Sequence, residues 1–250
     1  MRKRIIALLL LFVIALTACT SAPKGAEDDT REKRVFGTTE ATETETAELT
    51  EATEEVTEAT EATEETLPEP AELDLGVIDG NTYRNESLGI SCAFSDDWYI
   101  YNETDIASMN KYIISLYDNE AITEAIESGQ TVIIFAASNP ATMTSVQIAV
   151  SKSKATTADE SAILRSVTPM LLAQLEQSGV MTNIASDIVE AEFCGQTHAA
   201  LSITGETMGM QLYDTLLYLT RGDIFYGLSV TTTQESMIAE SLAMFEAIEE

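Results

Sequence analysis

The spacing of apolar residues changes along the chain and divides it into three parts. An unbroken apolar run covers residues 5–16, whereas Leu49 and Val56 are the only large apolar side chains between residues 38 and 66. From about residue 76 onwards, apolar positions recur with the periods of strands and helices. We therefore expect a leader at residues 1–18, a spacer at residues 19–75 and a folded domain at residues 76–250.

Alternating apolar and polar positions in the third part predict strands. The predicted strands are residues 82–85, 88–94, 98–101, 131–136, 146–150, 182–193, 196–204, 208–220 and 224–231. The last four are separated only by Gly195, Gly205-Glu206 and Gly222-Asp223, and separators this short favour hairpins. We expect these four strands to form an antiparallel meander.

Apolar residues three or four positions apart predict helices between the strands. The expected helices are residues 104–117, a segment from Asp118 to Gly129, one from Thr157 to Gly179, and one that follows Thr232 and buries Ile238, Leu242, Phe245 and Ile248. Thr157 with Glu160, and Thr232 with Glu235, have the spacing of a capping box.

Pro169 lies inside the third of these helices and is expected to kink or split it, because proline lacks a backbone N–H. The order of strands and helices indicates an α+β fold. We expect a single antiparallel sheet of about six to eight strands, flanked by helices.

The start of the chain has the pattern of an export signal. Arg2, Lys3 and Arg4 precede the apolar run, which has 12 residues and is too short for a membrane-spanning helix of roughly 20. Leu16-Thr17-Ala18-Cys19 resembles the lipobox of bacterial lipoproteins. The resemblance implies diacylglycerol on Cys19, cleavage before it, and a position on the extracytoplasmic face of the cell membrane. A plain secretory signal and an uncleaved anchor are the alternatives.

The second part is a low-complexity segment of threonine, glutamate and alanine. Residues 40–72 contain 13 glutamates and no basic residue, so the segment cannot bury enough apolar surface to offset the entropy of ordering. We expect a disordered, acidic spacer between the anchor and the domain. O-glycosylated threonines or a cation-binding brush are alternative roles for it.

The net charge of −29 limits the possible partners. Residues 75–250 alone carry 24 acidic and 6 basic side chains. Such a surface repels phosphate backbones, which argues against nucleic-acid binding, and it also repels anionic lipid headgroups. A small cationic ligand is favoured electrostatically.

The segment Y-R-N-E-S-L-G-I-S-C-A-F-S-D-D-W, from Tyr83 to Trp98, resembles the start of the PsbP-like domain. The family is named after an extrinsic subunit of photosystem II. The resemblance implies a PsbP-like α+β fold over about residues 80–249, together with an extracytoplasmic binding or assembly role. It implies no catalytic residues.

Residues with possible chemistry are few and scattered. His198 is the only histidine, and no Gly-x-Ser-x-Gly motif accompanies it. Cys92 and Cys194 could form a disulfide or remain free thiols. Asp96-Asp97 before Trp98, and Arg221-Gly222-Asp223, are best explained as turns.

We therefore expect no catalytic residues, no cofactor and no metal, with Cys19 as the single modified residue. The predicted function is a non-enzymatic module that binds a ligand or an envelope protein. A cell-envelope hydrolase and a structural or adhesive surface protein are the alternatives.

Overall fold

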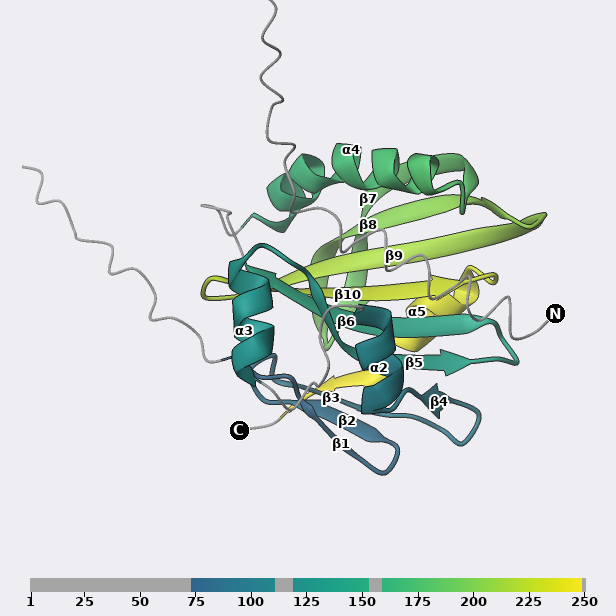
Figure 1. Ribbon diagram of the computed structural model, residues 1–250. Helices are drawn as coiled ribbons and strands as arrows, with labels where there is room; N and C mark the ends of the chain where they lie inside the picture. Colours follow the sequence, from purple (N-terminus) through teal and green to yellow (C-terminus); the bar gives the residue numbers. More distant parts are fainter. Residues whose placement is uncertain (1–72, 111–118, 153–158, 249–250) are drawn as a thin grey trace, which may run out of the picture. The chain divides into compact units, whose positions relative to one another are not determined.

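The computed structural model describes residues 73–110, 119–152 and 159–248 (Figure 1). The predictions for the leader, Cys19 and the acidic spacer concern residues outside these ranges. Within the described residues, no helix is both long and apolar enough to cross a membrane.

The described residues form a mixed α+β structure with two antiparallel sheets (Figure 1). The four-stranded sheet has the order β1 (Val77–Asp79), β2 (Thr82–Asn85), β3 (Ile90–Ala93), β11 (Phe245–Ala247). The seven-stranded sheet has the order β4 (Tyr99–Ile100), β5 (Val132–Asn139), β6 (Thr144–Lys152), β10 (Ile224–Thr232), β9 (Met210–Arg221), β8 (Gln196–Thr207), β7 (Thr182–Phe193). The helices are α2 (Glu103–Asn110), α3 (Asn119–Glu127), α4 (Glu160–Ser178) and α5 (Ser236–Leu242).

The predicted α+β class is confirmed, but the prediction of a single sheet is wrong. β2 pairs with β1 and β3, and β3 pairs with β11, so these strands form a sheet of their own instead of joining the larger one. The small sheet then packs on one face of the large one, where Tyr83 stacks on Phe135 at 4.2 Å between ring centroids. The core between the sheets includes Ile90, Phe94, Ile148, Leu217, Tyr226 and Phe245.

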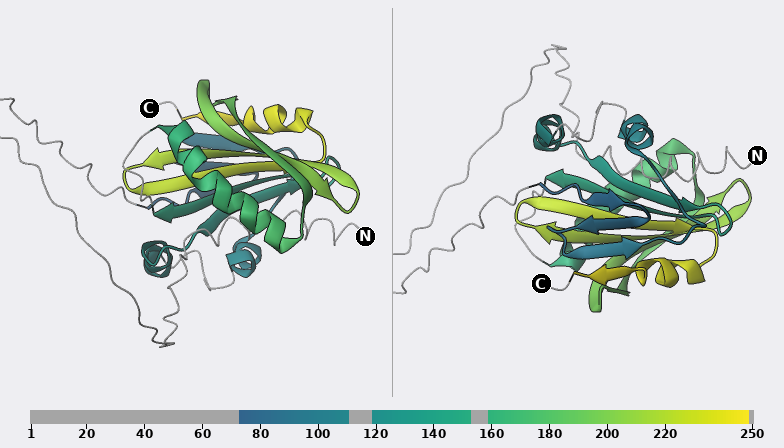
Figure 2. Two further views of the ribbon diagram at one scale, coloured as in Figure 1. Left: turned by 90° about the horizontal axis from the view of Figure 1, so that it is seen from above. Right: turned by 90° about the horizontal axis from the view of Figure 1, so that it is seen from below.

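Helices α4 and α2 cover parts of the opposite face of the large sheet (Figure 2). α4 packs on β7, β8 and β9, where Leu164, Leu171 and Leu175 meet Leu201 and Ile203. α2 packs on β5 at the other side of the same face through Ile106, which clusters with Ile133 and Ala136. Strands β6 and β10 lie between these two covered regions in the order of the sheet.

The last four long strands form the predicted antiparallel meander. One turn was placed wrongly, because β8 and β9 join at Met208–Gly209, and both residues have the positive φ of a type I′ hairpin. Gly205 lies within β8, where an added Cβ would stand 2.8 Å from a Met181 side-chain carbon and 2.9 Å from the Thr182 carbonyl oxygen. Its role is therefore close packing and not chain reversal.

Helix α4 ends at Gly179 as predicted, but its start differs from the expected capping box. Asp159 is the N-cap, and its Oδ1 accepts a hydrogen bond from the Ala162 amide at 3.2 Å. Thr157 lies outside the described residues. The helix continues through Pro169 without splitting. Pro169 is exposed, so water can solvate the carbonyl that loses its helical partner.

The last predicted helix is also shorter than expected. Thr232 remains in β10, opposite Tyr213, and Glu235 makes no side-chain cap bond, so the second capping box is wrong. α5 ends at Leu242, and the chain then enters β11. Phe245 is buried as predicted, but it reaches the core from a strand that pairs with β3.

Candidate functional site

A row of buried polar side chains crosses the helix-covered face of the seven-stranded sheet. Thr231 of β10 lies opposite Asp214 of β9 and Ser145 of β6, and Ser229 lies opposite Gln147. Opposite residues of an antiparallel pair share a face, as do residues two apart on one strand. These five residues, Ser145, Gln147, Asp214, Ser229 and Thr231, are called the polar strip below. Each is at most 3% exposed.

The polar strip lies between the two helix-covered parts of this face. Its strands are β6, β10 and β9, whereas α2 packs on β5 and α4 packs mainly on β7 to β9. The apolar residues Leu212 and Leu216 flank Asp214 on the same face and belong to the cluster under α4. The polar strip therefore interrupts what is otherwise an apolar surface.

Asp214 is the charged member of the polar strip. Its Oδ1 accepts hydrogen bonds from the Thr231 hydroxyl at 2.6 Å and from the Ser229 hydroxyl at 2.9 Å. Its Oδ2 has no hydrogen-bond partner among the described residues. Burial raises the pKa of Asp214 to about 6, and the two hydroxyl bonds only partly oppose this increase.

Gln147 lacks more hydrogen-bond partners than Asp214 does. Both its side-chain oxygen and its side-chain nitrogen are buried without a hydrogen-bond partner among the described residues. Leaving a buried polar group unpaired costs about 1–3 kcal/mol, and buried side-chain polar atoms are nearly always satisfied in native proteins. Gln147 therefore has the capacity to hydrogen-bond a molecule or an ordered water placed beside it.

The face continues beyond the polar strip into an apolar region on the same strands. Gly227 is two residues before Ser229 on β10, so it lies on the same face, opposite Ala149 and Tyr218. A Cβ added to Gly227 would meet only ordinary contacts, the nearest at 3.6 Å. Phe225 packs edge-on against Tyr218 with 5.9 Å between ring centroids. The polar strip thus adjoins a small residue and an aromatic pair.

A hollow with a volume of about 460 Å³ lies elsewhere, between β1 and α2. Its lining is mainly apolar and includes Val77 and Ile106. The two tyrosines in it are satisfied, because the Tyr83 hydroxyl donates to the Leu75 carbonyl and the Tyr101 hydroxyl bonds the Ser138 hydroxyl. Both tyrosine hydroxyls of this hollow therefore have hydrogen-bond partners, unlike Asp214 Oδ2 and the Gln147 amide in the polar strip.

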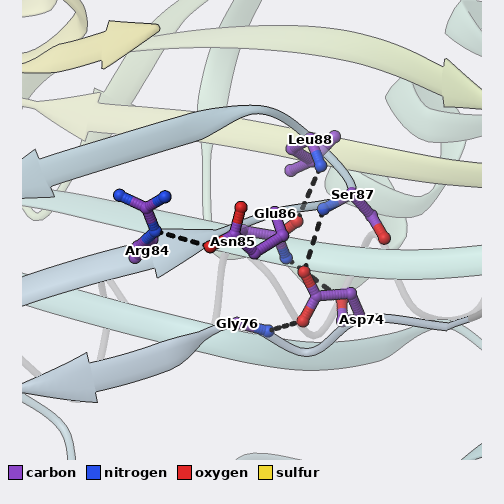
Figure 3. A network of polar contacts seen from close by, with 7 residues as sticks. All are labelled: Asp74, Gly76, Arg84, Asn85, Glu86, Ser87 and Leu88. Atoms are coloured by element: carbon purple, nitrogen blue, oxygen red, sulfur yellow. Dashed lines mark hydrogen bonds and ion pairs between the residues drawn. The ribbon is translucent and has the colours of Figure 1, made fainter. Parts of the chain in front are cut away.

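Asp74 is the centre of another polar network, shown in Figure 3. Its carboxylate accepts from the amides of Gly76 at 2.8 Å and Ser87 at 3.0 Å, and its backbone carbonyl accepts from the Asn85 side chain. Asn85 Oδ1 in turn accepts from the Leu88 amide. Each of these bonds joins protein groups to one another. The network fastens residues 74–76 to the turn between β2 and β3, so its role is structural.

The residues considered for catalysis in the sequence do not come together at the polar strip. His198 Nδ1 lies 2.8 Å from Glu160 Oε1, and Glu160 Oε2 accepts from the Ala199 amide. This pair fastens the start of α4 to β8. Among the described residues, no three His, Cys, Asp or Glu side chains are grouped as metal ligands.

Cys92 and Cys194 are both free thiols, and burial raises the pKa of Cys92 to about 12 and that of Cys194 to about 11. Such thiols are poor nucleophiles near neutral pH.

Both turn predictions are confirmed. Asp96 and Asp97 form a turn before Trp98, which packs edge-on against Phe94 at 5.3 Å. Gly222-Asp223 joins β9 to β10, and the Arg221 side chain donates to the Ser87 and Leu88 carbonyls. The Arg-Gly-Asp sequence therefore belongs to a hairpin whose arginine is held by the fold.

The sequence analysis did not identify Asp214 or Gln147. A signal was available, because Asp214 lies midway between Leu212 and Leu216, which share its face of a strand. A carboxylate between two leucines at spacing two is unusual on a buried face. Gln147 is likewise a polar residue in an apolar strand, between Val146 and Ile148. Which face of the sheet it occupies follows only from the pairing of β6 with β10.

Comparison with known proteins gives only distant structural similarity. No family model matches the chain, and a search of curated proteins finds no match. A crystal structure from Bacteroides thetaiotaomicron is 14% identical with a TM-score of 0.36, covering 69% of this chain and 50% of that one. The solution structure of cyanobacterial PsbP from Synechocystis is 8% identical with a TM-score of 0.40, covering 69% of this chain and 98% of that one.

Proposed function

We propose that this protein is a membrane-anchored extracytoplasmic lipoprotein whose domain, expected to be PsbP-like, binds a small ligand without transforming it. The observation that supports binding is the polar strip, where Asp214 Oδ2 and both amide atoms of Gln147 are buried without partners among the described residues. The lipobox resemblance at Leu16–Cys19 supports the anchor, and the acidic spacer would hold the domain away from the bilayer.

A binding role fits the polar strip better than hydrolysis does. The hydroxyls of Ser229 and Thr231 both donate to Asp214, whereas the single histidine of the chain is held by Glu160. A serine nucleophile needs a base that is itself oriented by a third group, and the described residues assemble no such triad there. A structural or adhesive role does not account for unpaired polar atoms within a sheet.

The binding role can be tested through stability, without knowing the ligand. Residues retained for binding commonly lower stability. Replacing Gln147 with methionine removes two unpaired polar atoms at nearly constant volume, so Gln147→Met should raise the free energy of unfolding by about 1–3 kcal/mol. Thr144→Val is the matched control, because the buried Thr144 hydroxyl has partners in Thr142 and Thr232 and its loss should destabilise the protein. A destabilised Gln147→Met variant would show that Gln147 is structural and would contradict the proposal.

The anchor can be tested by cell fractionation. Cys19→Ala should leave an unprocessed chain without lipid, whereas Cys194→Ala, which removes a cysteine within the domain, should be processed normally. Labelling with a radioactive fatty acid measures the modification directly. Fatty-acid labelling of the Cys19→Ala chain would contradict the assignment.

A further inference from the structure

We propose that the polar strip binds a small organic cation that carries an amide group beside its ammonium, with the ammonium at Asp214 and the amide at Gln147. This inference rests on the proposed binding function and specifies the chemistry of its ligand. An amino-acid amide, or the amino terminus of a peptide, has this combination of groups.

The position of Asp214 favours a cation. Oδ2 is free to accept a hydrogen bond, since Oδ1 takes both hydroxyl bonds. The basic side chains with described contacts bond elsewhere: Arg84 pairs with Glu86, Lys152 pairs with Asp223, and Arg221 donates to backbone carbonyls. An anionic ligand would meet a buried carboxylate with no compensating positive charge among these groups. The excess of 24 acidic over 6 basic residues in the domain also attracts cations.

Gln147 favours an amide as the second group. A primary amide has two N–H donors and one carbonyl acceptor, and at Gln147 both ends lack partners within the described residues. A ligand amide matches this set, because it accepts from the Gln147 nitrogen through its carbonyl and donates to the Gln147 oxygen through its own N–H. A ligand with only donors or only acceptors would leave one end of Gln147 unpaired.

The spacing allows one small molecule to contact both residues. Asp214 of β9 lies opposite Thr231 of β10, and Gln147 of β6 lies opposite Ser229, two residues away, so their backbones are about 12 Å apart. Both side chains lie on the same face of the sheet, and their length shortens this distance. Gly227 and the aromatic residue Phe225 follow along the same face, where an apolar substituent of the ligand can pack.

Three related probes separate these requirements: leucinamide with ammonium and amide, N-acetyl-leucinamide with amide only, and isoamylamine with ammonium only. Binding to chain 19–250 carrying Cys19→Ser, which retains every described residue, is measured by calorimetry near pH 7 with probes at up to about 10 mM, a concentration suited to millimolar dissociation constants. Leucinamide should bind at least about tenfold more tightly than either other probe, because charged hydrogen bonds are the stronger class.

The variants assign each preference to a residue. Asp214→Asn should remove the preference for leucinamide over N-acetyl-leucinamide, and Gln147→Met should remove the preference over isoamylamine. Thr197→Ala, on the exposed surface, is the control that should change neither.

The inference is overturned if N-acetyl-leucinamide binds as tightly as leucinamide, or if no probe binds and water alone occupies the polar strip. A preference for neutral probes that responds to Gln147→Met would still support a binding site at the polar strip. Failure of the proposed function itself would instead appear as the destabilised Gln147→Met variant described above.

Discussion

Asp214 gives the domain a distinctive pH dependence of stability. A carboxyl with a raised pKa in the folded state holds its proton there at pH values where the unfolded chain has already lost it. The folded state therefore binds more protons between the two pKa values, and the free energy of unfolding decreases as the pH rises through that interval. Asp214→Asn removes the titration while keeping the shape of the side chain, so the variant should lack this decrease.

The magnitude follows from the pKa of Asp214, which rises from 3.8 to about 6 on folding. Each tenfold change in proton affinity corresponds to about 1.4 kcal/mol, so the buried carboxylate should cost about 3 kcal/mol of stability above pH 6 compared with below pH 4. The shift has no charged neighbour among its causes: its opposing hydrogen bonds come from Ser229 and Thr231, and the residues opposite Asp214 on the adjacent strands, Ile203 and Thr231, are uncharged. In a domain of this size, 3 kcal/mol corresponds to about 6–12 °C in melting temperature.

Urea unfolding from about pH 4.5 to about pH 7.5, followed by fluorescence of Trp98, the single tryptophan, measures the effect. The difference in unfolding free energy between Asp214→Asn and the wild type should increase in favour of the variant as the pH rises. Asp187→Asn, which removes an exposed carboxylate from β7, controls for the loss of one charge. A difference that stays constant within about 0.5 kcal/mol over this range would refute the argument.

Three further predictions concern the fold. Gly205→Ala should destabilise the domain by about 1–3 kcal/mol in urea unfolding, because the new Cβ would stand 2.8 Å from a Met181 side-chain carbon. The control Gly227→Ala should cost less than about 1 kcal/mol, because its Cβ would meet only ordinary contacts. Equal effects of the two substitutions would contradict the packing argument. Glu160→Gln should lower stability by about 1–2 kcal/mol in the same assay by weakening its bonds to β8, and an unchanged midpoint would show that α4 is held by apolar contacts alone. Asp74→Ala should speed amide hydrogen exchange in residues 74–76 without changing exchange in β9, and global loss of protection would refute a local role.

The parts of the fold that were predicted correctly depend on local signals. The meander from β7 to β10 follows from alternating apolar residues and glycine-containing separators, because a two-residue hairpin sets the pairing of its own strands. Gly179 likewise ends α4 through its positive φ, a property of the residue itself.

The parts that were missed depend on pairing between distant segments. Phe245 has a helical spacing from Leu242, and only the contact with Cys92 of β3 decides that it belongs to a strand. Three strands of the second sheet pair through short connections, but only contacts with distant segments decide that they pack on the large sheet instead of joining it. The polar strip was missed for a related reason, since Gln147 and Asp214 come together only through β10.

The Asp74 network has a mechanical consequence. A pull applied at the start of the described residues acts on Leu73 and Asp74 first. The Asp74 carboxylate bonds the Ser87 amide, and its carbonyl accepts from the Asn85 side chain and the Tyr226 hydroxyl, so the load is divided between the small sheet and β10. A tensile force must therefore break several hydrogen bonds before it can separate β1 from β2. This junction protects the edge of the small sheet against mechanical unfolding.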